Sequence, residues 1–361
     1  MTPISLASGY GSFPAPAVVA PAVARQLPRA PWPASPTEGL AELRAALASR
    51  YLPHLPASGG ADAFLVTPGT KAALFLALSS VLQSGDEVVL LTPNWFGFAE
   101  LVRRAGGHLR ELPLSPADNY ALPLDAIAAA LTPRTRVLLF SNPNNPTGRI
   151  YTPPELKALL ALTRRFPALF VLADEIYDGI LFGPESVPSL LSFPDPGHRH
   201  LVVNGFSKSH ALVGWNIGWL AAPQAVRRAS AARLFATGGA VAVPSQLAAL
   251  AVLQDGNIGV DLCRQLLPNR QRLLGFLATL PGALPHPPLG TYYAFPDLRA
   301  FLTPNLPLPE ASADLVARLL AAGVEVVDGA TCGAPGFVRM SYAVPEPDLQ
   351  EAVRRLGAVL R

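Results

Sequence analysis

Short apolar runs alternate along the chain with longer segments in which apolar residues recur at helical spacing. The runs end in turn residues, as is typical of buried strands in a parallel sheet. They are Glu87–Leu91, Arg136–Phe140, Leu169–Ala173 and Leu201–Asn204. The helical segments between them are Lys71–Gln83, Gly97–Ala105, Leu124–Leu131 and Pro154–Arg165. This alternation predicts an α/β fold of the doubly wound class, with a mostly parallel sheet.

The pattern changes after about residue 269, which indicates a second unit. The elements expected there are helices at Gln271–Leu280, Asp314–Ala322 and Glu346–Leu360, and strands at Thr291–Phe295, Val324–Val327 and Gly336–Tyr342. A chain of 361 residues is also longer than one ordinary core requires. We therefore expect a large domain at residues 38–270 and a small α+β domain made of residues 1–37 and 271–361.

One helix start is marked by its own residues. Thr152 stands before Pro153, Pro154 and Glu155. Threonine caps helices, proline is tolerated in the first turn, and a glutamate suits the positive end of the helix dipole.

Composition excludes several partners. Lys and Arg exceed Asp and Glu by 28 − 25 = +3 and are scattered, so we expect no nucleic-acid partner. Cys263 and Cys332 have neither CxxC nor metal-ligand spacing. We therefore expect no metal and two free thiols in a reducing compartment.

Two apolar stretches differ from membrane-spanning and leader segments. Ala15–Ala24 has no basic residue before Arg25, and prolines 14, 16 and 21 disfavour a helix there. Ala240–Leu253 is too short to cross a bilayer. We therefore expect no membrane association and a cytoplasmic protein.

Polar residues follow three of the predicted strands. Asn145 comes after Arg136–Phe140, Asp174 after Leu169–Ala173, and Lys208 after Leu201–Asn204. Open α/β sheets bind ligands at the carboxyl ends of their strands, so these side chains should meet in one crevice.

The combination suits an enzyme that holds an aromatic aldehyde cofactor as a Schiff base. Lys208 would supply the amine and Asp174 a carboxylate for a ring nitrogen. Asn145 and Tyr177 would donate hydrogen bonds to a ring oxygen. Burial near a cationic ring should lower the pKa of Lys208.

A phosphate site is predicted at the start of the helix Lys71–Gln83. Gly69, Thr70 and Lys71 open this helix, where backbone amides and small residues admit an anion. Ser207 can add a hydroxyl.

Four segments resemble the class I/II aminotransferases of the fold-type I pyridoxal-phosphate enzymes. They are Asn142-Pro-Asn-Asn-Pro-Thr-Gly148, Asp174-Glu-Ile-Tyr177, Asn204-Gly-Phe-Ser-Lys208 and Phe337-Val-Arg-Met-Ser341. The resemblance covers nearly the whole chain. It implies a large domain with a seven-stranded, mostly parallel sheet, a small α+β domain, and a homodimer.

The resemblance also implies a function and roles. The cofactor would be pyridoxal 5'-phosphate, and the reaction transfer of an amino group between an α-amino acid and a 2-oxo acid. Lys208 would move the proton between the substrate Cα and the cofactor, Trp95 would stack on the ring, and Arg339 and Asn145 would bind the substrate.

Two positions depart from the family pattern. Asn216 stands in Gly214-Trp-Asn216-Ile-Gly218, where family members usually carry a phosphate-binding arginine. An amide donates a hydrogen bond but cannot neutralise a dianion. The tyrosine normally lent across the dimer is also missing, and Trp32 lies nearest its position.

Two other functions stay open at this point. A carbon–sulfur β-lyase of the same fold would use the same lysine and ring partners, and loss of the phosphate arginine resembles the lyases. A non-catalytic pyridoxal-phosphate-binding protein is the third possibility. For the substrate side chain, no second arginine marks a dicarboxylate site, and Tyr10, Phe13 and Tyr292 are interpreted as packing residues.

Overall fold

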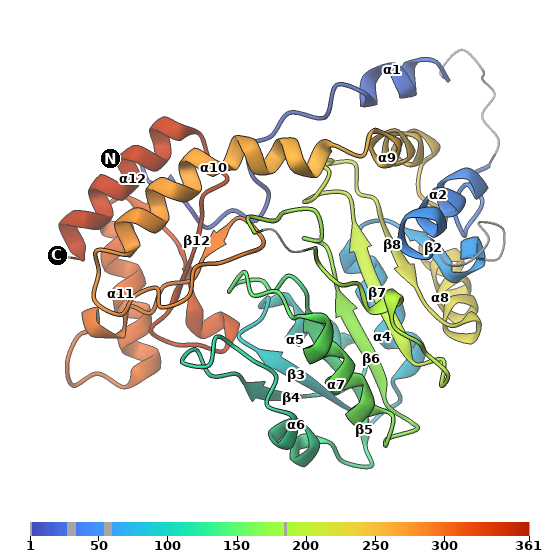
Figure 1. Ribbon diagram of the computed structural model, residues 1–361, viewed down its shortest axis with the longest axis horizontal. Coiled ribbons are helices and arrows are strands. Elements are labelled where there is room, and N and C mark those ends of the chain that lie inside the picture. Colours follow the sequence, from blue (N-terminus) through green and yellow to red (C-terminus); the bar gives the residue numbers. More distant parts are fainter. Residues whose placement is uncertain (1, 27–33, 54–59, 184–185, 361) are drawn as a thin grey trace.

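The computed structural model describes residues 2–26, 34–53, 60–183 and 186–360. Its centre is a seven-stranded sheet, shown in Figure 1. In spatial order the strands are β2 (Phe64–Thr67), β8 (Gly218–Ala221), β7 (His200–Gly205), β6 (Phe170–Asp174), β5 (Thr135–Ser141), β3 (Glu87–Thr92) and β4 (His108–Pro113). Strand β8 runs antiparallel to both its neighbours, and the other pairings are parallel. The predicted mostly parallel sheet is confirmed.

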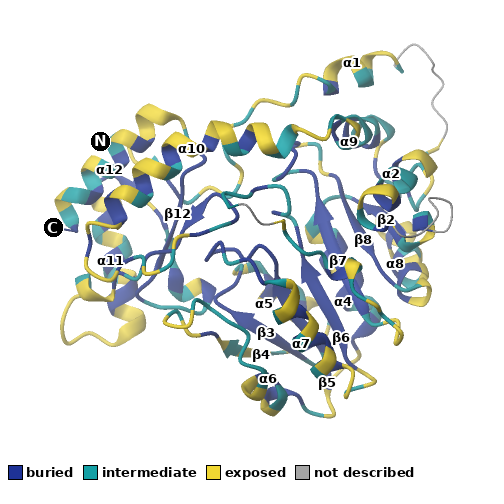
Figure 2. Ribbon diagram, viewed as in Figure 1, coloured by how far each residue is buried: buried dark blue, intermediate teal, exposed yellow. Residues whose placement is uncertain are grey.

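Helices cover both faces of this sheet because alternate strand residues are apolar on both sides. Val88 and Leu90 face a core shared with one set of helices, and Val89 and Leu91 face the other. The first set is α4 (Thr70–Val81), α5 (Gly97–Arg104) and α8 (Gln224–Thr237). The second set is α2 (Ala41–Tyr51), α6 (Leu124–Ala130), α7 (Pro153–Thr163) and α9 (Val243–Asp255). Figure 2 shows the strands as a buried layer between partly exposed helices.

The C-terminal part forms a separate apolar core. Its antiparallel sheet has the order β11 (Val327–Asp328), β12 (Val338–Ser341), β9 (Tyr293–Ala294). The helices are α10 (Ile258–Leu277), α11 (Leu308–Ala321) and α12 (Glu346–Val359). Short 3₁₀ turns occur at Ala61–Ala63, Leu190–Ser192, Arg299–Phe301 and Gly329–Cys332.

Several boundaries differ from the sequence predictions. Helix α10 begins at Ile258 rather than 271, and Pro268 lies inside it. Its buried face continues across that proline from Leu262 and Leu266 to Leu273, so packing outweighs the lost hydrogen bond. The strand predicted at Val324–Val327 is two strands, of which β10 (Val324–Glu325) belongs to a different sheet from β11.

The N-terminal segment runs along both parts of the molecule. Strand β1 (Ile4–Ser5) pairs in parallel with β10 of the C-terminal part. Helix α1 (Val19–Ala24) packs instead on α9, and Val19 belongs to the core of the large sheet. This helix forms despite Pro21, which is its third residue, where a backbone N–H has no partner within the helix. The division at residues 38–270 therefore stays a proposal.

Candidate active site

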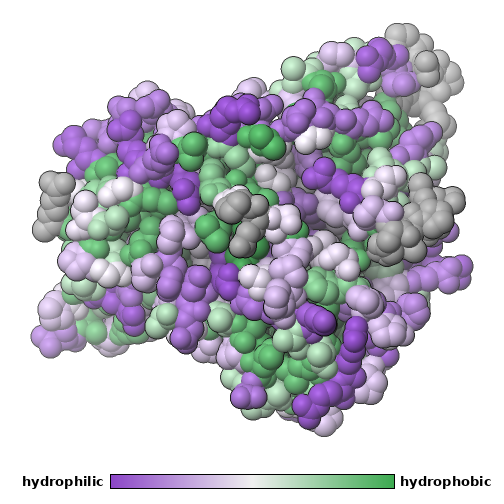
Figure 3. Space-filling model, viewed as in Figure 1, coloured by the Kyte–Doolittle hydropathy of each residue, from purple (hydrophilic) through white to green (hydrophobic). Residues whose placement is uncertain are grey.

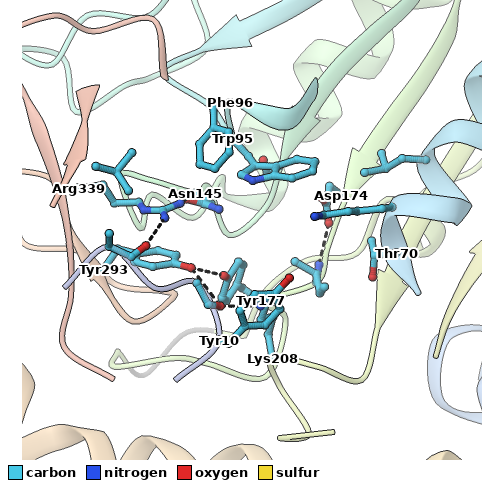
Figure 4. A pocket seen from close by; sticks show the side chains of 17 residues that line it. Tyr10, Thr70, Trp95, Phe96, Asn145, Asp174, Tyr177, Lys208, Tyr293 and Arg339 are labelled. Carbon is cyan, nitrogen blue, oxygen red and sulfur yellow. Dashed lines mark hydrogen bonds between the residues drawn. The ribbon is translucent and has the colours of Figure 1, made fainter. Parts of the chain in front are cut away.

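A cavity of about 380 Å³ lies at the carboxyl ends of the parallel strands, between the large sheet and the C-terminal part. Figure 4 shows the side chains that line it. Eight of the predicted site residues are among them: Thr70, Lys71, Trp95, Asn145, Asp174, Tyr177, Lys208 and Arg339. Gly69 and Ser207 are outside this lining; each directly precedes a residue within it. The predicted convergence on one crevice is confirmed.

Lys208 stands in the turn after β7, three residues beyond Gly205. Its Nζ donates a hydrogen bond to the Gly9 carbonyl at 2.5 Å and lies 4.0 Å from the centre of the Tyr10 ring. Burial, followed by the positive charges of Arg339 and Lys71, lowers the pKa of Lys208 to about 7. The amine is therefore available in its neutral, nucleophilic form near neutral pH.

Asp174 is the last residue of β6 and is only 7% exposed. Its Oδ1 accepts a hydrogen bond from the Ile176 amide at 3.1 Å. Burial raises the pKa of Asp174 to about 7, which the Ile176 amide and Lys208 oppose. Among the described residues no cation lies within ion-pair distance of this carboxylate. A cationic ligand would supply the partner that it lacks.

Tyr177 and Asn145 hold their predicted places beside the cavity. The Tyr177 hydroxyl lies 2.7 Å from the Tyr293 hydroxyl, and both side chains are buried. The Asn145 oxygen accepts a hydrogen bond from Arg339 at 3.1 Å, which leaves the amide hydrogens of Asn145 to act as donors.

Arg339 extends from β12 into the cavity and is 3% exposed. Besides its bond to Asn145, it donates to the Ala7 carbonyl at 3.0 Å, and its guanidinium carbon lies 4.4 Å from the centre of the Tyr293 ring. Its Nε finds no hydrogen-bond partner among the residues that the structure describes. In the described part of the chain no carboxylate pairs with this buried cation. A ligand carboxylate would complete its shell of partners.

The N-terminus of α4 forms the opposite corner of the cavity. Strands β7 and β8 approach it closely because Gly205 and Gly218 have no side chain. A Cβ on Gly218 would lie 2.8 Å from the Thr70 amide nitrogen, and one on Gly205 would lie 2.3 Å from the Thr70 hydroxyl. Gly69 caps the helix at φ +84°, and a Cβ there would lie 2.9 Å from the Asn216 oxygen. Asn216 therefore faces the corner at which the sequence predicts a phosphate site.

Two further predicted residues flank the same corner. Lys71 is exposed, and its Nζ lies 5.5 Å from the centre of the Trp95 ring. Trp95 packs edge-on against Phe98, with a ring separation of 5.3 Å. Trp32, the nearest substitute for the missing tyrosine, lies outside the described residues.

Sequence reasoning missed residues that the N-terminal segment brings to the cavity. Gly9 and Tyr10 contact Lys208 directly, so Tyr10 lines the cavity, a place that the sequence analysis did not assign to it. Phe96 and Tyr293 also line the cavity. Phe96 directly follows the predicted Trp95. Gly9, Tyr10 and Tyr293 instead reach Lys208 and Tyr177 through contacts with segments far away in the chain, which no local pattern marks.

Within the described ranges no group of three or more His, Cys, Asp or Glu side chains is placed to hold a metal ion. No helix found there has both the length and the apolar character needed to cross a membrane.

Comparisons with known proteins agree on one family. Residues 3–356 match the model for "Aminotransferase class I and II". The chain is 33% identical to an aspartate aminotransferase of Streptomyces avermitilis over 90% of this chain and 81% of the relative. It is also 33% identical to an aspartate/prephenate aminotransferase of Thermus thermophilus, over 99% and 91%.

Solved structures give the same result. The aspartate aminotransferase of Thermus thermophilus with maleate superimposes with a TM-score of 0.90 at 32% identity, covering 99% of this chain and 92% of that one. The enzyme from Rhizobium meliloti gives 0.90 at 29% identity, over 99% and 91%. The chain therefore belongs to the class I and II aminotransferases, which are fold-type I enzymes that use pyridoxal 5'-phosphate.

Proposed function

We propose that this aminotransferase moves an amino group between an α-amino acid and a 2-oxo acid in the 380 Å³ cavity, with Lys208 as the residue that bonds to the cofactor. One observation carries the proposal. The same cavity is lined by the half-buried Lys208, whose pKa is lowered, and by the buried carboxylate of Asp174 and the buried guanidinium of Arg339, neither of which has an ion-pair partner among the described residues.

The residues present fit pyridoxal phosphate. The Asp174 carboxylate lacks a cation, and the protonated ring nitrogen is one. The corner at Gly69 and Thr70 offers helix amides to the phosphate, and Trp95 offers a flat surface to the ring. Tyr177 and Asn145 supply donors for the ring oxygen.

When bound, pyridoxal phosphate supplies an electron-withdrawing ring that spreads the negative charge left when a proton leaves the substrate Cα. Asp174 keeps the ring nitrogen protonated. The Lys208 amine, neutral near pH 7, would take the proton from the substrate Cα at its Nζ and then pass that proton to the cofactor. Arg339 binds the substrate carboxylate with two parallel N–H donors and so fixes the orientation of Cα.

Aspartate is the first amino donor to test, because several relatives are named aspartate aminotransferases. Lys71 is a third cation at the cavity, so a second substrate carboxylate has a charge to meet even though the sequence shows no second arginine for it.

The lysine assignment can be tested by covalent trapping. Lys71, Lys157 and Lys208 are the lysines of the chain, so peptide mapping after borohydride reduction has three candidates. We expect the label on Lys208. Lys157 lies exposed on α7, away from the cavity, so Lys157→Gln is the matched control and should bind and label as wild type. A label on Lys71 or Lys157 would refute the assignment.

The reaction is tested with a panel of amino acids. A suitable donor should remove the aldehyde absorbance of the loaded protein, and a 2-oxo acid should restore it. Release of pyruvate from a β-substituted amino acid with no 2-oxo acid present would instead indicate β-elimination.

We further propose a homodimer in the cytoplasm. The family pattern supports the dimer, and the free thiols Cys263 and Cys332 suit a reducing compartment.

A further inference from the structure

Tyr293 makes a contact that the roles above leave unexplained. Its hydroxyl lies 2.7 Å from that of Tyr177, and the two side chains are 0% and 2% exposed. They come from different parts of the chain: Tyr293 from β9 and Tyr177 from the turn after β6. Figure 4 shows this contact at the cavity wall, next to Lys208.

The donors and acceptors around this pair restrict its direction. The Gly9 carbonyl can only accept, and it already receives the Lys208 amine at 2.5 Å and the Tyr292 hydroxyl at 2.6 Å. The Tyr293 hydroxyl lies 3.5 Å from the same carbonyl, a much longer contact than its 2.7 Å bond to Tyr177. The Tyr293 hydroxyl can therefore donate its hydrogen bond to Tyr177, and the Gly9 carbonyl still has hydrogen-bond donors.

Each tyrosine hydroxyl has one proton to give. When Tyr177 donates to the ring oxygen of the cofactor, its own oxygen becomes an acceptor, and the bond to Tyr293 requires the Tyr293 proton. A hydroxyl that receives a hydrogen bond is a better donor in turn, because neighbouring bonds polarise one another.

We propose that Tyr293 is a positioning residue, which donates to Tyr177 and thereby orients and strengthens the hydrogen bond from Tyr177 to the ring oxygen of the cofactor. This inference rests on the proposed function, in which Tyr177 contacts that oxygen. Tyr293 itself acts through Tyr177.

Other titratable groups surround the pair and are left unchanged by the test. Arg339 faces Tyr293 from β12, Lys208 approaches from the turn after β7, Asp174 from the end of β6, and Tyr292 precedes Tyr293 in the chain. Removing only the Tyr293 hydroxyl keeps all of these charges in place.

The experiment measures the pKa of the lysine–cofactor linkage from the absorbance of the loaded protein across pH. When the lysine nitrogen of the linkage loses its proton, the negative ring oxygen loses the partner that this proton gave it. A hydrogen-bond donor on the ring oxygen replaces that partner and so lowers the pKa of the linkage. Tyr177→Phe should raise this pKa by about one unit, and Tyr293→Phe by roughly 0.3–0.5 unit. Tyr293→Phe should have no effect in a Tyr177→Phe background.

A matched control separates this role from loss of packing. Tyr342 is fully buried in the same apolar core, and its hydroxyl donates to the Thr291 carbonyl at 2.9 Å. Tyr342→Phe removes a comparable hydrogen bond and should leave the pKa of the linkage unchanged.

The possible outcomes separate a failure of this inference from a failure of the proposed function on which it rests. A shift with Tyr177→Phe but none with Tyr293→Phe would overturn the inference alone. An equal shift from Tyr293→Phe in both backgrounds would also overturn it, because Tyr293 would then act directly. No shift with Tyr177→Phe would overturn the proposed role of Tyr177 and the inference together.

Discussion

The charge state of Lys208 follows from its surroundings. Burial is the largest cause of its lowered pKa, Arg339 is the next, and the value is about 7. The neutral fraction of the amine therefore rises with pH through about 7, rather than near the ordinary value of 10.5. We expect the rate at which apo-protein bonds to pyridoxal phosphate to rise over the same range.

Variants that each remove one positive charge test this pH dependence. Arg339→Gln removes the second cause, so the rise in rate should move to higher pH. Lys157→Gln removes a distant surface charge and should leave the profile in place. Stopped-flow absorbance at a series of pH values measures both. A wild-type rate that rises only near pH 10 would contradict the lowered pKa.

A substitution at Asn216 tests whether the predicted phosphate site at the N-terminus of α4 lacks a positive charge. Its oxygen lies beside Gly69 at the N-terminus of α4, so Asn216→Arg would place a cation where the phosphate is expected. A charge-assisted hydrogen bond contributes roughly 1.5–3 kcal/mol, a tenfold or larger gain in affinity. We expect the variant to bind pyridoxal phosphate more tightly in a titration of apo-protein. Unchanged or weaker binding would mean that Lys71 or another cation already neutralises the phosphate.

At the scale of single elements, local signals predicted those structures that depend on local contacts. The helix start at Thr152 is confirmed as a capping box with Glu155. The ends of β5, β6 and β7 delivered Asn145, Asp174 and Lys208 to one cavity, as parallel strands must. Strand β4 was not predicted, because an edge strand such as His108–Pro113 leaves most of its side chains exposed and has no apolar run.

The junction between α4 and the sheet gives a test at this scale. A Cβ on Gly218 would lie 2.8 Å from backbone atoms of Gly69 and Thr70, so Gly218→Ala must displace the N-terminus of α4. We expect a loss of about 1–3 kcal/mol in the free energy of unfolding, together with weaker cofactor binding. Denaturant melts and cofactor titration measure the two effects.

The control is a glycine with free space around it. Gly275 lies inside α10, and no atom of the described ranges outside its own helix backbone and chain neighbours comes within 4 Å of an added Cβ. Gly275→Ala should stabilise the protein by about 0.5–1 kcal/mol and leave cofactor binding unchanged. Wild-type cofactor affinity in Gly218→Ala would show that the position of α4 does not set the phosphate corner.

At the scale of the whole molecule, the sequence could not reveal contacts between its distant ends. The bond from Arg339 to the Ala7 carbonyl joins residues 332 positions apart, and Lys208 bonds to Gly9 across 199. The pairing of β1 with β10 and the bond from the Ser341 amide to the Leu6 carbonyl lead the N-terminal segment to the cavity. No residue type or spacing near Gly9 encodes that pairing, so the sequence did not predict that Gly9 and Tyr10 contact Lys208.

The expected homodimer can be tested at exposed apolar residues. Hydrophobic and hydrophilic side chains are interspersed on the face shown in Figure 3. Among exposed apolar residues, Phe235 on α8 stands out at 74%, and Val260 on α10 is 59% exposed. In the expected homodimer a second copy would cover the Phe235 ring, because burying a phenyl ring stabilises an interface. We therefore expect light scattering to give a mass near twice the 38.0 kDa of the chain.

Phe235 also allows the interface to be located. A carboxylate in its place would be desolvated by a covering partner, so Phe235→Asp should shift the mass toward that of a monomer at low micromolar concentration. Leu320 is 48% exposed on α11, in the C-terminal part, and Leu320→Asp is the matched control that should stay dimeric. A dimer unaffected by Phe235→Asp would place the interface elsewhere. A wild-type protein that is monomeric and fully active at the same concentration would show that one chain completes the site alone.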